Sequence, residues 1–449
     1  MRFIPVSDAQ RDAMLRVVGV PAVDSLFEVI PEGVRLGRPL DLQQPMNEQA
    51  LRRHLDDVAY HGCPCQLVPF LGAGCYDHYV PAIVDAVISK PEFFTAYTPY
   101  QAEVSQGTLQ AIYEFQSMIC MLTGMDVANA SMYDGATALV EAAYLAVHQT
   151  GRRRVVVAST IHPEWLETLL TYATAGLIDP VVVPAERGLV DLAALREQVA
   201  DAAAVLVASP NFFGHIEDLA AVRAIADEAG ALMVVAANPI LLGLIEPPAA
   251  YGADVVVGEG QPLGCPMTFG GPGFGFFACK QQFVRRMPGR IVGRTVDAEG
   301  RDAFVLTMQA REQHIRRERA TSNICSNHSL LALAASVYLA SVGPDGLEQV
   351  ARVCCANARY LRARLIATGM FDPEFMWDDG DEPAFGYEFV LRYHGDVAEM
   401  QGRMLELGYL AGLDLGRIDE EHEGLVLFAV TEQRTREEID SFVREVAHP

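Results

Sequence analysis

Lysine is scarce in this sequence. Of its 449 residues, 34 are lysine or arginine, and only Lys90 and Lys280 are lysines. Chemistry that depends on a lysine amine therefore has two candidates. The sequence also contains no Walker A motif, no G-x-S-x-G elbow and no H-E-x-x-H pair. These absences exclude ordinary P-loop nucleotide binders, α/β-hydrolases and zincin metalloproteases.

Positive charge is also in short supply. The chain has 34 basic residues and 58 acidic ones, which gives a formal net charge of -24. Nucleic acids and anionic membranes require a positive face, so neither is an expected partner. No signal peptide is evident, and the longest apolar run, residues 231–245, is too short to cross a membrane. We expect a soluble, cytoplasmic protein.

The nine cysteines follow no regular spacing. Cys63 and Cys65 are separated by one residue, and Cys354 and Cys355 are adjacent, so neither pair has zinc-ribbon spacing. The histidines fall at no metal-binding spacing either. We expect reduced, mostly buried thiols and no metal site.

From residue 154 onward, short runs of β-branched residues alternate with helical patterns. The expected strands are residues 155–157, 181–183, 205–207, 232–235 and 254–257. The expected helices between them are residues 163–175, 192–199 and 219–229. Apolar strands that alternate with helices indicate an α/β fold, with a mainly parallel sheet covered on both faces.

The patterns divide the chain into three regions. Residues 1–70 are predicted to form an N-terminal helical arm, residues 71–325 a large α/β domain, and residues 326–449 a small C-terminal α+β domain. Within the large domain, a helix is expected over about 105–122, and the basic residues 311–319 are also predicted to be helical.

Two segments carry candidate functional residues. Asp134 precedes a predicted helix, whose unpaired N–H groups can hold an anion or simply accept a cap. Residues 97–101 form a loop with two tyrosines, since Pro99 prevents regular structure. Such a loop is either a binding surface or a cover over the core.

Five segments resemble, in order, the motifs of the P-protein of the glycine cleavage system, in its two-chain form and in the first of its two subunits. These segments are residues 97–110, 128–138, 258–264, 269–272 and 319–325. The likeness extends over nearly the whole chain. It implies the aspartate-aminotransferase fold, which is fold type I of the pyridoxal-phosphate enzymes, and this fold agrees with the large α/β and small α+β domains.

The resemblance also implies a reaction, that of glycine dehydrogenase (decarboxylating), an oxidoreductase. In that family, pyridoxal 5'-phosphate supports the decarboxylation of glycine, and the aminomethyl group passes to the lipoyl arm of the H-protein. The cofactor needs a lysine that holds it as an imine and a carboxylate that pairs with its pyridine nitrogen.

This sequence departs from the family at both positions. The carboxylate position falls at Val235 or Ala236, and the lysine position falls at Gln261 or Pro262. A glutamine amide cannot form an imine, and neither valine nor alanine can keep the ring protonated. We therefore expect no catalytic residue, no metal and no covalently bound cofactor in this chain.

The resemblance then implies a partner. The expected complex is a heterodimer or heterotetramer with a homologous subunit that binds pyridoxal phosphate, and it uses glycine and the lipoylated H-protein. Tyr97, Thr98, Tyr100 and Gln101 are the candidates for contact with the partner's active site. The alternatives are an independently active decarboxylase or aminotransferase that uses Lys280, and a non-enzymatic scaffold of the same fold.

Overall fold

The computed structural model describes residues 6–61, 67–376 and 382–448, and the chain divides into two compact units, residues 1–65 and 66–449. The first unit contains helix α1 (Asp8–Val18) and helix α2 (Glu48–His61), joined by a segment with two short 3-10 helices. Ser7 and Gln10 form a capping box at the start of α1, which satisfies orphan N–H groups there. No residue of α1 is buried, and Val17 is 88% exposed.

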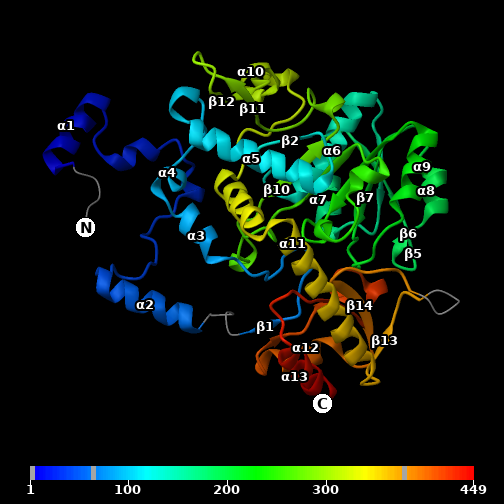
Figure 1. Ribbon diagram of the computed structural model, residues 1–449. Coiled ribbons are helices and arrows are strands. Elements are labelled where there is room, and N and C mark those ends of the chain that lie inside the picture. Colours follow the sequence, from blue (N-terminus) through cyan, green and yellow to red (C-terminus); the bar gives the residue numbers. More distant parts are fainter. Residues whose placement is uncertain (1–5, 62–66, 377–381, 449) are drawn as a thin grey trace. The chain divides into compact units, whose positions relative to one another are not determined.

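The second unit is built around a seven-stranded sheet in the order β2-β10-β9-β8-β7-β3-β4 (Figure 1). Its strands are β2 (Val127–Ala128), β3 (Arg154–Ala158), β4 (Asp179–Val183), β7 (Ala202–Ser209), β8 (Leu232–Ala237), β9 (Val255–Glu259) and β10 (Gly275–Cys279). The five strands from β9 to β4 are parallel, and β10 is antiparallel to both of its neighbours. The predicted parallel sheet is therefore confirmed.

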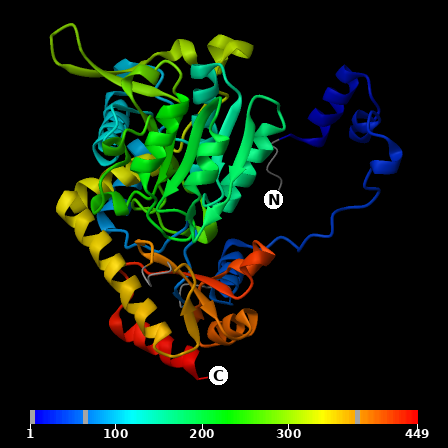
Figure 2. The same cartoon turned by 90° about the vertical axis from the view of Figure 1, so that its right-hand side faces the viewer.

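Helices cover both faces of this sheet, and in Figure 2 the strands run between them. One face packs on α6 (Gly135–Thr150) and α7 (Pro163–Ala173), and the other packs on α5 (Gln106–Thr123) and α9 (Leu219–Ala229). Successive side chains of a strand point to opposite faces. Val155 and Val157 accordingly belong to the α6 core, whereas Val156 belongs to the opposite core.

Helix α11 (Ser329–Ile366) runs from the large sheet to the small domain. Its length and composition would suit a membrane span, but Gly343 has a non-helical conformation (φ 64°, ψ 179°) and precedes Pro344, so the element is two helices joined at a kink. The first part packs on α3 (Ala82–Ile88) and α5, and the second part packs on the last helix of the chain. Some of its apolar side chains, among them Tyr338, Leu361 and Leu365, thus belong to the protein core.

The C-terminal region forms an antiparallel sheet in the order β13-β14-β17-β16, as the α+β pattern predicts. Its elements are β13 (Phe371–Pro373), β14 (Glu388–Tyr393), α12 (Val397–Glu406), β16 (Leu413–Asp414), β17 (Leu425–Ala429) and α13 (Arg436–Ala447). Strand β1 (Val68–Pro69) pairs in parallel with β15 (Tyr409–Leu410), so the chain at the start of the second unit is attached to this region. The division at residues 70 and 325 stays a prediction.

One prediction near the end of the large domain is wrong. A hairpin of β11 (Ile291–Val296) and β12 (Asp302–Thr307) packs on α5, and a single helix does not follow it. The basic residues 311–319 form only short pieces, of which α10 (Gln313–Arg316) is the longest. Arg317 has φ 55°, and a residue in this left-handed region interrupts helical hydrogen bonding.

Candidate functional site

A hollow opens where the parallel strands β7, β8 and β9 end. Ligands of open α/β sheets bind in this position, outside the carboxyl ends of the strands. Its lining comes from the loop after β1, from the ends of these strands, from the start of α7 and from the small domain: Ala73, Gly74, Tyr76, His162, Trp165, Ala208, Pro210, Asn211, Phe212, Ala236, Ala237, Asn238, Pro239, Glu259, Pro262 and Glu388.

Glu259, the last residue of β9, reaches the start of helix α6. Its Oε2 accepts the N–H of Gly135 at 3.0 Å, and its Oε1 accepts the N–H groups of Gln261 and Phe274, each at 3.1 Å. Burial raises the pKa of Glu259 to about 7, although these three hydrogen bonds favour the ionised form. The carboxyl group therefore occupies the position at a helix N-terminus that favours an anion.

Asp134 is the N-cap of α6, as predicted. Its Oδ1 accepts the N–H of Thr137 at 2.7 Å within a capping box. Trp165 covers the first residue of the same helix, because a Cβ atom on Gly135 would lie only 2.2 Å from the indole ring. Glu259 and Asp134 thus accept the N–H groups of Gly135 and Thr137 in the first turn of the helix.

His162 lies in the hollow with both ring nitrogens occupied. Nε2 donates to the carbonyl of Ala73 at 2.9 Å, and Nδ1 accepts the N–H of Glu164 at 3.2 Å, which fixes the neutral tautomer. Burial lowers the pKa of His162. The sequence pattern does not distinguish this histidine from the others, because its role depends on a contact with Ala73, 89 positions away.

Gln261, one of the two candidates for the lysine position, holds neighbouring backbone segments together. Its Nε2 donates to the carbonyls of Tyr76 and Cys265 at 2.9 and 2.7 Å, and its Oε1 accepts the N–H of Tyr76 at 3.0 Å. The side chain is buried, and these three hydrogen bonds all go to backbone groups. Its neighbour Pro262 lines the hollow.

The sheet distinguishes the two candidates for the carboxylate position, because they point to opposite faces. Ala236 lines the hollow, whereas Val235 points into the core on the opposite face. A second buried carboxyl, that of Glu388, borders the hollow instead and accepts the N–H of Ala73 and the hydroxyl of Tyr76, both at 2.8 Å. Burial raises the pKa of Glu388 to about 7.

Both lysines lie away from the hollow. Lys280 donates to Asp254 at 2.7 Å and to the carbonyl of Gly252 at 3.0 Å, at the opposite end of β9 from Glu259. A five-residue strand spans roughly 17 Å, so the amine cannot reach the hollow. Lys90 precedes α4 (Pro91–Phe94), is exposed and does not line the hollow.

The loop of Tyr97, Thr98, Tyr100 and Gln101 also stands outside the hollow. Tyr97 is 79% exposed and Tyr100 is 59% exposed. The Tyr100 ring lies 5.7 Å from the guanidinium of Arg290, whose N–H donates to the hydroxyl at 3.4 Å. The two tyrosines therefore present their surface outward from this chain.

These residues do not fit pyridoxal phosphate. A phosphate bound at the start of α6 would meet the carboxylate of Glu259, and a ring above Ala236 would find no acid at that position. No lysine lines the hollow. The sequence pattern shows that the acid and the lysine are missing. Only the fold shows that the carboxylate of Glu259 lies where the phosphate would bind.

Comparisons with known proteins agree over the full chain. The family described as glycine cleavage system P-protein matches residues 1–446. A protein of Moorella thermoacetica, named probable glycine dehydrogenase (decarboxylating) subunit 1, is 49% identical over 99% of this chain and 98% of its own length. A protein of Geobacillus sp. with the same name is 48% identical with the same coverage.

A crystal structure of glycine decarboxylase (P-protein) of the glycine cleavage system, in an inhibitor-bound form, is similar throughout. It has a TM-score of 0.87 and 42% sequence identity, and the match covers 100% of this chain and 99% of the other. A glutamate decarboxylase of Lactobacillus brevis, at 16% identity and a TM-score of 0.65, shares the fold.

Proposed function

The chain belongs to the glycine cleavage system P-protein family, and we propose that it is the subunit of a two-chain glycine dehydrogenase (decarboxylating) that holds no cofactor. A homologous subunit binds pyridoxal phosphate and carries out the chemistry on glycine. The aminomethyl group then passes to the lipoyl arm of the H-protein. The cytoplasmic location stays a prediction.

The position of Glu259 is the observation that carries this proposal. Its carboxyl group accepts the N–H of Gly135 at the start of α6, where a phosphate would otherwise be held, and also the N–H groups of Gln261 and Phe274. The candidates for the lysine position are Gln261, whose amide is hydrogen-bonded to backbone groups, and Pro262, which has no amine. Side chains of this chain therefore occupy the places where the phosphate and the lysine would lie.

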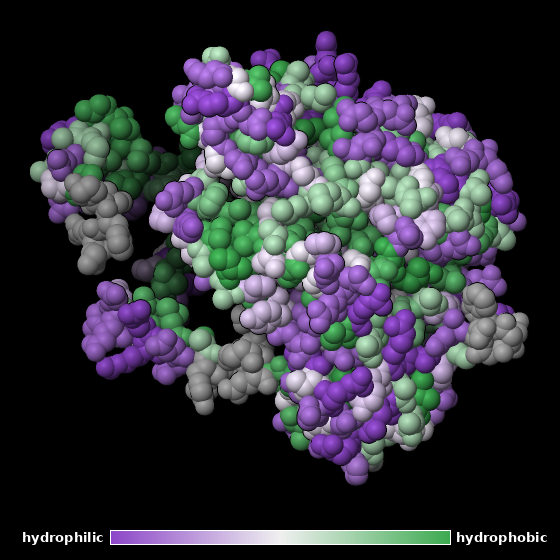
Figure 3. Space-filling view, in the orientation of Figure 1, coloured by the Kyte–Doolittle hydropathy of each residue, from purple (hydrophilic) through white to green (hydrophobic). Residues whose placement is uncertain are grey.

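Exposed apolar residues of the second unit supply a surface for the partner. Figure 3 shows hydrophobic surface over α3 and the adjacent start of α11. A groove between α4, α5 and α11 is lined by apolar side chains that include Phe93, Ile112 and Leu333, and the exposed Phe94 and Tyr97 lie beside it in sequence. Exposed apolar surface of this kind is typical of a protein interface.

Lys280 offers no support for independent catalysis. Its amine is bound to Asp254 at the far end of β9, and Asp254 also pairs with Arg223 at 2.8 Å. An amine in this position contacts the end of β9 that lies away from the hollow, so it cannot reach a substrate in the hollow.

Separate expression of the two subunits tests the proposal. The exchange of the glycine carboxyl group with bicarbonate, which reports decarboxylation, is measured for this chain alone, for the cofactor-bearing homologue alone and for the mixture. We expect exchange only in the mixture, together with a complex on gel filtration. Exchange by this chain alone, with added pyridoxal phosphate, would contradict the proposal.

A further inference from the structure

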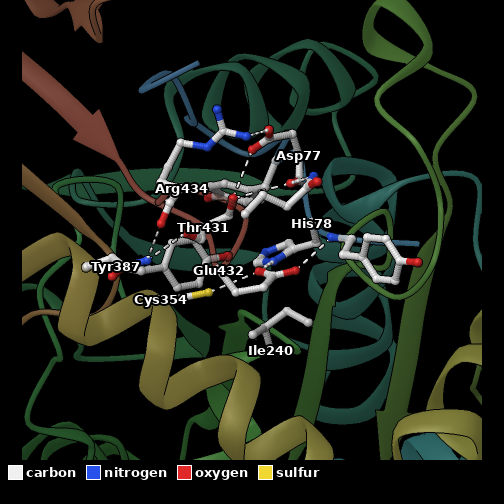
Figure 4. A network of polar contacts seen from close by, with 12 residues as sticks. Asp77, His78, Ile240, Cys354, Tyr387, Thr431, Glu432 and Arg434 are labelled. Carbon is white, nitrogen blue, oxygen red and sulfur yellow. Dashed lines mark hydrogen bonds and ion pairs between the residues drawn. The ribbon is translucent and has the colours of Figure 1, made fainter. Parts of the chain in front are cut away.

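Three side chains that can bind a transition metal meet between the large sheet and the small domain. His78 comes from the loop before α3, Cys354 from the second part of α11, and Glu432 from the loop after β17 (Figure 4). His78 Nδ1 lies 2.7 Å from Glu432 Oε2, and Cys354 Sγ lies 3.3 Å from the same oxygen. One ligand atom from each residue lies within 4.8 Å of the other two.

The imidazole of this cluster is buried and turned toward the carboxylate. The His78 side chain is only 2% exposed, and its Nδ1 faces Glu432. Nδ1 is therefore the ring nitrogen that an ion between the three side chains would bind, while Nε2 has no hydrogen-bond partner among the residues that the structure describes.

The surrounding contacts hold the three side chains in place. The second oxygen of Glu432 accepts the N–H of Tyr79 at 2.7 Å. On the adjacent residues, Asp77 pairs with Arg434 at 2.8 Å and accepts the hydroxyl of Thr431 at 3.0 Å. These contacts join the His78 loop to the Glu432 loop, and such outer contacts orient metal ligands.

The donor set suits a zinc ion. Imidazole, thiolate and carboxylate are the zinc ligands of proteins, with bonds of about 2.0–2.3 Å. Tetrahedral bonds of this length place ligand atoms roughly 3.3–3.6 Å apart. The observed 2.7 and 3.3 Å come within a fraction of an ångström of that range. Mg²⁺ and Ca²⁺ prefer oxygen ligands alone, so sulfur and imidazole exclude them.

Charge favours the same assignment. A divalent cation would balance the two negative charges of a thiolate and a carboxylate. Binding releases the thiol proton to solvent, and His78 binds as the neutral ring.

We propose that His78, Cys354 and Glu432 form a binding site for one Zn²⁺ ion, with a water molecule at the fourth position. The ion joins three segments that are far apart in sequence and fixes the small domain against the loop before α3. The ligand spacings of 276 and 78 residues explain why the sequence pattern predicts no metal site.

Metal loading of the full-length chain tests this proposal. The protein is stripped with a chelator, loaded with Zn²⁺ and dialysed, and its zinc content is measured. Co²⁺ is used in parallel, because a thiolate ligand gives a charge-transfer band. We expect one Zn²⁺ per chain in the wild type. Cys354→Ser and Glu432→Gln should weaken binding by roughly 100-fold or more, and Cys354→Ser should remove the charge-transfer band.

Two control variants separate this site from other thiols. Cys355→Ser alters the adjacent buried cysteine, whose sulfur lies near Arg359, and Cys63→Ser/Cys65→Ser removes the other close pair of cysteines. Both should bind zinc as the wild type does. Wild-type protein with no more zinc than Cys354→Ser, or loss of zinc in either control, would overturn the proposal.

A thermal measurement covers the case in which Cys354→Ser does not fold. Zn²⁺ should raise the Tm of the stripped wild type and of Cys355→Ser by the same amount, since an ion that binds only the folded chain stabilises it. The absence of a rise in both proteins would equally overturn the site.

Discussion

The half-buried carboxyl groups of Glu259 and Glu432 are held in different ways. Glu259 lies in the hollow at the end of the sheet, where it accepts three backbone N–H groups. Glu432 is hydrogen-bonded to the side chains of His78 and Cys354. Tyr387 packs edge-on against both Tyr76 of the hollow and His78.

The difference shows what closes a site. A polar group whose hydrogen bonds are all satisfied gains little from a ligand, because binding must first break those bonds. In the hollow, the side chains of Glu259 and Gln261 have their hydrogen bonds satisfied in this way, although the fold is one that binds a cofactor. The cluster of His78, Cys354 and Glu432 instead brings together N, S and O donors, a mixture that favours a metal ion.

The largest expected effect concerns pH and the second carboxyl group of the hollow. Burial raises the pKa of Glu388 to about 7 from an ordinary 4.5, so the folded state binds the proton more tightly than the unfolded state. The contribution of Glu388 to stability is therefore present below pH 4.5 and is lost as the pH rises to about 7, by ~3 kcal/mol.

Urea unfolding from pH 4.5 to 7 measures this effect. Glu388→Gln keeps an oxygen for the Ala73 N–H and should lose most of the pH dependence that is specific to this group. If the wild type and the variant lose stability in parallel over that range, Glu388 is not the titrating group.

The next effect concerns Glu259. Glu259→Ala leaves three N–H groups without their acceptor and should lower the free energy of unfolding by about 2 kcal/mol. Inorganic phosphate should then raise the Tm of the variant but not of the wild type, because the start of α6 becomes free for an anion. The exposed Glu164→Ala serves as the control and should change stability by less than about 0.5 kcal/mol. An equal phosphate effect in wild type and variant would mean that Glu259 does not fill this position.

The exposed loop gives a smaller effect, which is seen only in the complex. If the loop contacts the partner's active site, as we propose, Tyr97→Phe and Tyr100→Phe each remove a hydroxyl from that site and should lower carboxyl exchange by the two-chain complex by about tenfold, or ~1.4 kcal/mol. The stability of the isolated chain should not change. Tyr79→Phe, at the same 59% exposure as Tyr100 but outside the loop, is the matched control. Full activity in all three variants would show that the loop does not contact the partner's active site.

The smallest effect is expected at Lys280. Lys280→Gln removes one ion pair with Asp254, but Arg223 still pairs with that carboxylate. The loss should be about 0.5 kcal/mol in thermal unfolding, and the complex should keep its activity. A complete loss of exchange by the folded variant would restore Lys280 as a catalytic candidate.

The sequence predicts the fold well where a local pattern decides it. The parallel strands, the helices between them and the Asp134 cap follow from periodicity and capping chemistry. The missing lysine and acid follow from the motifs on either side of Gln261 and Ala236. The basic residues 311–319 fail as a helix because Arg317 adopts a left-handed conformation, which no local pattern signals.

The remaining features depend on contacts between distant residues. Glu259 reaches Gly135 across 124 positions, and His162 meets Ala73 across 89. His78 and Glu432 are 354 residues apart. Spacing rules describe ligands or caps within one element, so a site assembled from three elements has no signature in a single sequence.

Borohydride reduction of the assembled two-chain enzyme, followed by peptide mapping of both subunits, tests the central claim most directly. The account predicts a pyridoxal adduct on the homologous subunit only, with Lys90 and Lys280 of this chain unmodified. An adduct on either of these lysines, together with glycine turnover by this chain alone, would contradict it.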